Sequence, residues 1–137
     1  MPAEAPETYP RNLVTSPRPR RRVLIADNSP DLVAVLGEVI RMDGSFEFVG
    51  HVSTGAAAVA RVRSETIDVL LLDLGLEDCH GFDVLDQLVA AGAVTKVIVH
   101  TGHSSGEMKA AAKSRGAVAY VVKSGSVEEL LAAIHAA

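Results

Sequence analysis

The sequence predicts a single α/β domain in which five strands and five helices alternate around a parallel sheet. The chain has 137 residues, a typical length for one domain. Apolar residues make up 48% of the sequence and aromatic residues only 4%, and such aliphatic cores suit helices packed on a parallel sheet. From residue 22 onward, short apolar runs alternate five times with segments of helical periodicity.

The first strand and helix are predicted between residues 22 and 44. Residues 23–26 (Val-Leu-Ile-Ala) form a short apolar run that indicates a buried strand. The Asn28-Ser29-Pro30 segment predicts a helix start, because Asn or Ser can cap a helix and proline is tolerated in its first turn. Gly44 is expected to end this helix in a left-handed conformation. Its apolar face is Leu32, Val35, Leu36, Val39 and Ile40.

The middle of the chain predicts two more strand and helix pairs. Residues 46–52 form the second strand, and an Ala-rich helix follows over residues 54–64. Residues 68–72 (Asp-Val-Leu-Leu-Leu) have the strongest character of a buried strand. After a loop, residues 82–90 predict a helix that Gly92 closes.

The last two units each contain a Ser-x-x-Glu sequence, which is typical of a helix start. Residues 96–100 form the fourth strand, and Ser104 to Glu107 is the first capping box, opening a helix that runs to Gly116. Residues 118–122 form the fifth strand. Ser126 to Glu129 is the second capping box and opens the last helix.

This alternation predicts a three-layer sandwich, because each parallel crossover places a helix on a face of the sheet. Right-handed crossovers leave few topologies. We expect the flavodoxin-like (βα)5 fold, a five-stranded parallel sheet of order 2-1-3-4-5.

The first 21 residues differ in composition from the rest of the chain. They contain five of the six prolines and no apolar periodicity, so we expect a flexible Pro/Arg-rich extension at 1–21 and a folded domain at 22–137. The segment 1–22 contains five Arg against two Glu, which leaves eight Lys and Arg against fifteen Asp and Glu in the remainder. The acidic body does not resemble a nucleic-acid surface. The basic extension is either a solvated tail or a contact for an acidic partner.

The sequence also limits the compartment. Cys79 is the single cysteine, so no intrachain disulfide is possible and a reducing compartment is the simplest interpretation. The N-terminus lacks the pattern of a secretory signal, and no apolar run approaches the roughly 18 residues of a membrane span. We expect a cytoplasmic protein without membrane contact.

Polar side chains directly follow four of the predicted strands. Asp27 and Asn28 follow the first strand, Asp73 the third, Thr101 the fourth and Lys123 the fifth. The carboxyl ends of parallel strands meet at one edge of the sheet, where ligands bind. A carboxylate is a nucleophile toward phosphorus, and hydroxyl and ammonium groups stabilise phosphoryl oxygens. Carboxylates also suit a hard cation such as Mg²⁺.

The sequence resembles the receiver domain of two-component response regulators over about residues 22–136. Four segments carry the resemblance, in the order and at the spacing of the family: VLIADNSP at 23–30, DVLLLDL at 68–74, VIVHTG at 97–102 and GAVAYVVK at 116–123. The closest similarity in character is to receivers of LuxR-type regulators.

The resemblance implies a role for seven residues of one pocket. These are the phosphoacceptor Asp73, the phosphate-pairing Lys123, the switch residues Thr101 and Tyr120, and the Mg²⁺ ligands Asp27, Asn28, Asp73 and, through its backbone carbonyl, Gly75.

Several positions depart from the family pattern. Asn28 stands where a second acid is usual, so we expect Mg²⁺ to bind weakly. Glu77 replaces a common proline; it either restores negative charge near the pocket or is a solvated loop residue, and we favour the solvated interpretation. His80 replaces a common Asp, and Ser124 replaces a frequent proline, as in receivers of LuxR-type regulators. The histidines near this edge, among them His100, lack the ligand spacing of a zinc site.

Two functions remain open. The first is a phosphorylation switch, not an enzyme, which accepts a phosphoryl group on Asp73 from a histidine kinase or phosphotransfer protein and signals to a protein output partner. The second is a phosphorylation-independent pseudo-receiver, favoured by Asn28. A cofactor-binding enzyme on this fold is disfavoured, because no Gly-rich phosphate loop follows the first strand.

The assembly of the chain is a further expectation. We expect a free-standing receiver, because the sequence begins at Met1 and ends just after the fifth helix, leaving no room for an output domain. Dimerisation through the face of the fourth helix, fifth strand and fifth helix is a possibility that the resemblance suggests.

Overall fold

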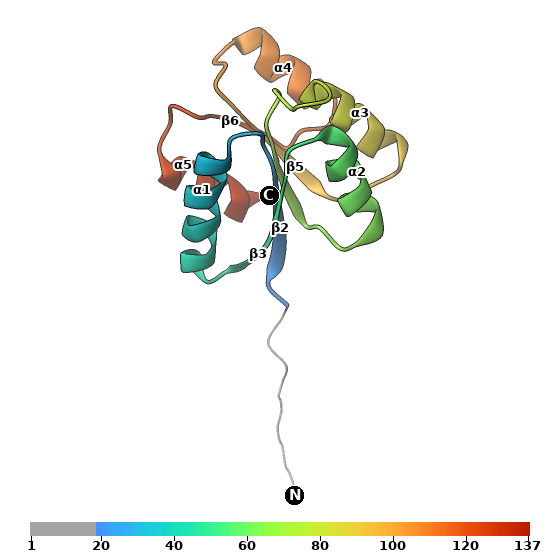
Figure 1. The fold of residues 1–137 in the computed structure, drawn as a ribbon. Helices are drawn as coiled ribbons and strands as arrows, with labels where there is room; N and C mark the ends of the chain where they lie inside the picture. Colours follow the sequence, from blue (N-terminus) through green and yellow to red (C-terminus); the bar gives the residue numbers. More distant parts are fainter. Residues whose placement is uncertain (1–18) are drawn as a thin grey trace, which may run out of the picture.

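The computed structural model describes residues 19–137 (Figure 1). Most of the predicted extension lies outside the described residues. Its last residue, Arg21, is already the first residue of a strand. The folded part therefore begins one residue earlier than the sequence predicted.

The sheet has five parallel strands. Their order is β3-β2-β4-β5-β6, which is the predicted order 2-1-3-4-5 when the strands are counted along the chain. The strands are β2 (Arg21–Ala26), β3 (Phe46–Val52), β4 (Val69–Leu72), β5 (Lys96–Thr101) and β6 (Ala119–Val122).

The helices of the described residues cover the two faces of the sheet (Figure 1). Those on one face are α1 (Pro30–Asp43) and α5 (Val127–Ala136). Those on the other face are α2 (Gly55–Ser64), α3 (Gly81–Ala90) and α4 (Gly106–Ser114). The predicted three-layer α/β sandwich is confirmed.

Two apolar cores hold these layers together, one on each side of the sheet. The core under α2, α3 and α4 takes Leu70 and Leu72 from the central strand β4, and the core under α1 and α5 takes Val69 and Leu71. All four side chains are at most 1% exposed. Burial of each one stabilises the fold by about 1.5–3 kcal/mol, and this explains the uninterrupted apolar run in the sequence.

Helix ends agree with most of the predicted signals. The side chain of Thr54 accepts a hydrogen bond from Ala57 N at 3.1 Å, and that of Ser126 accepts one from Glu129 N at 3.1 Å. Gly44 ends α1 with φ of 82°, in the left-handed region that glycine adopts without strain.

Two predicted helix starts differ from the structure, one by a residue and one in the group that makes the capping bond. The cap of α4 is Ser105, which accepts from Met108 N at 3.3 Å, because the helix begins one residue later than the Ser104 box implied. Ser29 precedes α1 without a capping bond from its side chain. Instead, Asp27 Oδ1 accepts a hydrogen bond from Ser29 N at 2.9 Å. The prediction for Gly92 is confirmed: it follows the C-cap Ala91 of α3 with φ of 69°, and its N–H donates to Val89 O at 3.0 Å.

Candidate functional site

The strand ends bring the predicted polar residues together. Ala26 pairs with Leu72 in the register of β2 and β4, so the next residues, Asp27 and Asp73, are neighbours. Thr101 ends β5, and Lys123 directly follows β6. The site is therefore assembled from four strands that are separated by up to about a hundred residues of sequence.

The centre of the site is an ion triad. Lys123 Nζ lies 2.8 Å from Asp27 Oδ2 and 3.1 Å from Asp73 Oδ2. Asp27 is 3% exposed and Asp73 is 8% exposed. Burial lowers the pKa of Lys123, but the hydrogen bonds to Asp27 and Asp73 outweigh it, and the pKa is raised above its usual value. Lys123 therefore stays charged and partly neutralises the two carboxylates.

The loop after Asp73 is held close to the carboxylate. Gly81 N donates to Leu74 O at 2.8 Å, and Gly75 pairs with His80 in an isolated antiparallel bridge. A side chain at Gly81 would meet the Asp73 carbonyl at 2.7 Å. Glycine at this position therefore lets the start of α3 approach the end of β4.

Asp78 fixes the same loop to α2, a contact that was not predicted. Its carboxylate accepts hydrogen bonds from Gly55 N at 2.7 Å and Ala56 N at 3.1 Å. These two bonds are the main reason that the pKa of Asp78 is lowered. The carboxylate caps α2 from a distant loop, so no local sequence signal indicated it. Its neighbour Glu77 is exposed, as the solvated interpretation expected.

Both predicted switch residues contact His103, on the loop after β5. Thr101 is 1% exposed, and its hydroxyl accepts a hydrogen bond from His103 N at 3.4 Å. Tyr120 donates its hydroxyl proton to His103 O at 2.8 Å. The ring of Tyr120 packs against the core under α3 and α4, and its burial raises the pKa of the hydroxyl. One loop residue thus joins the two side chains.

The donor atoms of the site suit Mg²⁺. The site has one negative charge fewer than is usual, because Asn28 stands where the family has a second acid. Asp27 and Asp73 provide carboxylates, Asn28 is exposed and carries an amide oxygen, and Gly75 is exposed beside Asp73. Hard oxygen ligands with room for several waters are what Mg²⁺ prefers. Within residues 19–137 no group of three His, Cys, Asp or Glu side chains is placed to hold a metal ion. The oxygen donors of Asp27, Asn28, Asp73 and Gly75 are nevertheless of the kind that suits Mg²⁺.

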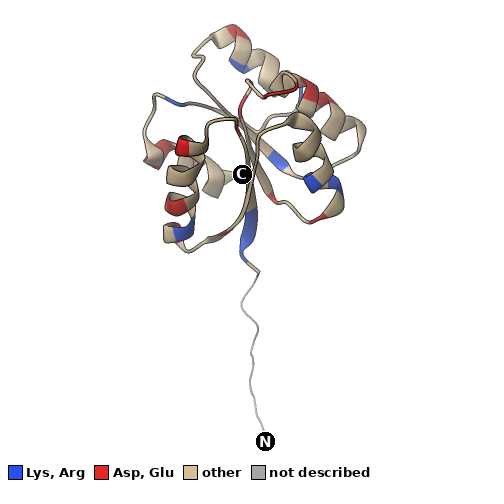
Figure 2. Cartoon of the chain, viewed as in Figure 1, with Lys and Arg blue, Asp and Glu red and all other residues tan. Residues whose placement is uncertain are grey.

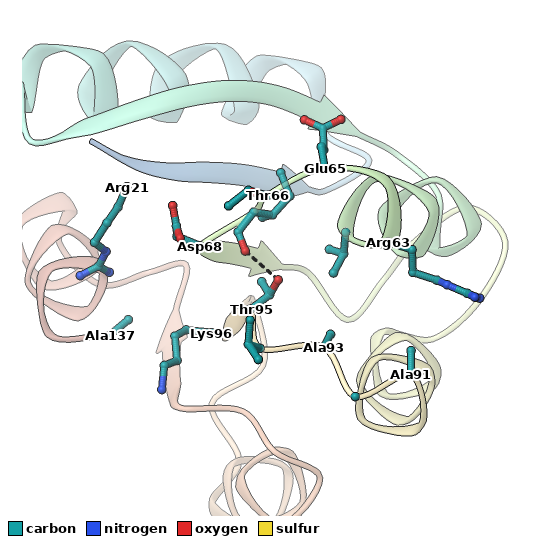
Figure 3. Close-up of a pocket in the computed structure, with 14 residues that line it drawn as sticks. Arg21, Arg63, Glu65, Thr66, Asp68, Ala91, Ala93, Thr95, Lys96 and Ala137 are labelled. Atoms are coloured by element: carbon teal, nitrogen blue, oxygen red, sulfur yellow. Dashed lines mark hydrogen bonds between the residues drawn. The ribbon is translucent and has the colours of Figure 1, made fainter. Parts of the chain in front are cut away.

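A separate cavity of about 610 Å³ opens at the amino ends of the strands (Figure 3). Asp68, Thr95 and Lys96 line it, and Thr95 donates its hydroxyl proton to Ile67 O at 2.7 Å. None of the predicted site residues lines this cavity. Figure 2 shows basic residues at the start of β2 and acidic residues on the loop between β4 and α3.

The chain belongs to the response regulator receiver domain family of two-component systems, whose family model matches residues 23–135. It is 31% identical over 117 residues to the transcriptional regulatory protein PdtaR of Mycobacterium tuberculosis, covering 85% of this chain and 56% of that protein. It is 30% identical over 115 residues to the nitrate/nitrite response regulator protein NarP of Escherichia coli, covering 84% of this chain and 54% of NarP. The chain thus spans about half the length of these relatives.

Solved structures give the same family and fold. A DNA-binding response regulator of the LuxR family from Staphylococcus aureus superposes with a TM-score of 0.79 at 25% identity, covering 85% of this chain and 97% of that one. A CheY-like receiver domain protein from Methanospirillum hungatei JF-1 gives 0.78 at 24% identity, covering 86% and 93%, and supports the fold alone. Receiver domains of this family generally bind Mg²⁺ and interact with kinases and output domains.

No helix between residues 19 and 137 has both the length and the apolar character needed to cross a membrane.

Proposed function

We propose that this chain is a phosphorylation switch that accepts a phosphoryl group on Asp73. The observation that carries the proposal is the ion triad, in which Lys123 Nζ lies 3.1 Å from Asp73 Oδ2 and 2.8 Å from Asp27 Oδ2. It presents a buried nucleophilic carboxylate beside a cation that can pair with phosphoryl oxygens.

In the proposed transfer, a carboxylate oxygen of Asp73 attacks the phosphorus of the donor. A new bond forms between phosphorus and Asp73, and the bond from phosphorus to the donor breaks with its electron pair leaving on the donor. Lys123 moves its N–H donors from the carboxylates to a phosphoryl oxygen, and the Thr101 hydroxyl turns to donate to another. The donor is a phosphohistidine of a histidine kinase or of a phosphotransfer protein.

Four residues would hold Mg²⁺ in this pocket: Asp27, Asn28, Asp73 and Gly75 through its carbonyl. The ion supplies positive charge to the phosphoryl oxygens during transfer. Because Asn28 carries no charge, we expect phosphorylation to need more Mg²⁺ than a pocket with three acids would.

The signal is proposed to leave the site through Thr101 and Tyr120. Once Thr101 turns toward the phosphoryl group, it releases His103 N, and the Tyr120 bond to the same residue loses its support. This would change the surface of α4, β6 and α5, where a protein output partner or a second copy of the chain could bind. We propose that the chain catalyses no reaction other than its own phosphorylation and dephosphorylation. We also propose a cytoplasmic location, where the donor kinase domains act.

The test is intact-mass analysis of the chain after incubation with acetyl phosphate and Mg²⁺, beside an Asp73→Asn variant. The proposal expects one phosphoryl adduct that depends on Mg²⁺ and is absent from the variant. An equal adduct on the variant would show that the phosphoacceptor lies elsewhere.

A second candidate, a phosphorylation-independent pseudo-receiver, is favoured by Asn28. A magnesium titration followed by NMR separates the two. The pseudo-receiver expects no site-local shift changes at millimolar Mg²⁺, whereas the switch expects them at Asp27, Asn28 and Asp73.

A further inference from the structure

His100, in β5, has no part in the proposed switch although it lies next to the phosphoacceptor. Val99 pairs with Leu72 across β5 and β4, so the following residues, His100 and Asp73, are neighbours at the end of the sheet. Such lateral neighbours on one face of a sheet lie close enough for their side chains to interact.

The two side chains also share a face of the sheet. Ile98 of β5 and Leu71 of β4 both belong to the core under α1 and α5. Side chains alternate along a strand, so the residues two positions further, His100 and Asp73, point to that same side.

The Lys123 side chain passes over this position. His100 pairs with Val121 of β6, and Lys123 follows two residues later on the same face. Its ammonium reaches Asp73 and Asp27, which follow strands beyond β5 in the sheet. The lysine must therefore cross the end of β5, where His100 lies.

The imidazole is buried and has no polar partner in the described part of the chain. His100 is 6% exposed, and no hydrogen bond or ion pair of its ring is found among residues 19–137. The imidazole ring carries at least one N–H in either protonation state, and leaving that donor unbonded in the interior costs free energy.

Asp73 offers the matching acceptor. Its Oδ2 accepts from Lys123, while no hydrogen bond to its Oδ1 is found among the described residues. His100 does not complete a three-ligand metal site with Asp27 and Asp73, since no such group is present in residues 19–137. His100 and Asp73 are thus neighbours on one face of the sheet and have complementary donor and acceptor groups, and the structure has no hydrogen bond between them while Lys123 Nζ is bound to Asp73 Oδ2.

We propose that His100 is a positioning residue that donates its ring N–H to the Asp73 carboxylate when Lys123 leaves it for a phosphoryl oxygen. This inference rests on the proposed function for its effect on phosphoryl lifetime. In hydrolysis, a water oxygen attacks phosphorus, the bond from phosphorus to Asp73 breaks, and its electron pair stays on the carboxylate. Inorganic phosphate leaves, and the proton of the water passes to solvent.

A hydrogen bond from His100 stabilises the negative charge that develops on Asp73 in this step. Without it, the carboxylate is a poorer leaving group, because Lys123 is engaged with the phosphoryl group and Asp27 repels the new charge. His100 therefore shortens the lifetime of the phosphorylated state.

The kinetic test follows the decay of the phosphoryl adduct by intact mass after acetyl phosphate is removed. His100→Leu is expected to lengthen the half-life about fivefold, the effect of one lost hydrogen bond. His100→Asn keeps an N–H donor and should remain near the parent, and Ile98→Val, on the same face of β5, controls for packing. Equal decay in parent and His100→Leu, or no rescue by His100→Asn, overturns the proposal.

A second measurement does not depend on phosphorylation. In Lys123→Met, Asp73 has lost its lysine, so the His100 ring N–H should give a proton NMR signal protected from exchange with water. That signal should vanish in Lys123→Met combined with Asp73→Asn. If the parent takes no phosphoryl group but this signal appears, the proposed function fails and the pairing of His100 with Asp73 stands; if Lys123→Met shows no such signal, the pairing is wrong.

Discussion

The two ends of the sheet contain the same kinds of charged groups in different surroundings. At the carboxyl end, Lys123 pairs with Asp27 and Asp73, which are 3% and 8% exposed. At the amino end, Arg22 and Arg61 pair with Glu65 at 2.9 and 2.6 Å, and the Glu65 side chain is 30% exposed.

The two ends differ in how far their charged groups are in contact with water and in whether a carboxylate oxygen is left without a hydrogen bond. Water screens the pairs at the amino end, so they contribute little to stability and do not depend on one another strongly. The carboxylates at the carboxyl end have lost most of their water, so removal of their cation leaves two buried charges that repel each other. A buried carboxylate with an oxygen that accepts no hydrogen bond lowers the stability of the fold, and the same oxygen is free to react.

Removal of Lys123 should lower the stability of the protein more than any change at the amino end of the sheet. We expect Lys123→Met to lose about 3 kcal/mol of unfolding free energy at pH 7, because it leaves Asp27 and Asp73 buried without a cation. The raised pKa of Lys123 means that its contribution is complete below the ordinary value of 10.5 and is lost as the pH rises through the higher folded value. Urea denaturation at pH 7 measures the loss. A loss below about 1 kcal/mol would place this triad with the solvent-screened pairs.

Gly81 tests the packing that shapes the site. In Gly81→Ala the new Cβ would lie 2.7 Å from the Asp73 carbonyl oxygen and 2.9 Å from Leu74 Cα, both backbone atoms. We expect a loss of about 2 kcal/mol, as for other overpacked interiors. Gly102→Ala is the matched control, since nothing lies within 4 Å of its Cβ position. Thermal unfolding of both variants checks the prediction, and equal melting temperatures would contradict it.

Asp78 tests whether the loop beside Asp73 depends on a carboxylate that caps α2. Asp78→Ala should lower stability less than Gly81→Ala does and should weaken Mg²⁺ binding, because the Gly75 carbonyl is on the loop that Asp78 anchors. The lowered pKa of Asp78 means that its contribution is present above the ordinary value of 3.8 and is lost as the pH falls through the folded value. The stability difference between parent and variant should therefore shrink in acid. A difference that grows below pH 4 would contradict this assignment.

The amino end should give the smallest effect. Glu65→Gln removes the partner of Arg61 and Arg22, yet we expect a urea midpoint within error of the parent at physiological salt, because the pair is screened. The pKa of Glu65 is lowered, mainly by the hydrogen bond from Arg61, so any contribution is present above the ordinary value of 4.5 and is lost in acid. A loss as large as that of Lys123→Met would show that the two ends do not differ as described.

The sequence predicted the parts of the molecule that follow from strand order. Asp27, Asp73, Thr101 and Lys123 each directly follow or end an apolar run, and the parallel topology alone brings such positions to one edge. Parts that depend on tertiary contacts were missed. The Asp78 carboxylate caps a helix 23 residues away in sequence. The sequence indicated that His100 lies near this edge, but its position beside Asp73 depends on the register between β4 and β5.

The central claim is that the carboxyl end of the sheet, and not the cavity at the amino end, binds the phosphoryl group. Addition of beryllofluoride, a phosphoryl mimic, with Mg²⁺ to the ¹⁵N-labelled chain tests it most directly by two-dimensional NMR. The account predicts large shift changes for the amides of Asp73, Thr101 and Lys123, and unchanged amides for Ile67 and Thr95. Unchanged site amides, or shifts confined to the amino end, would contradict it.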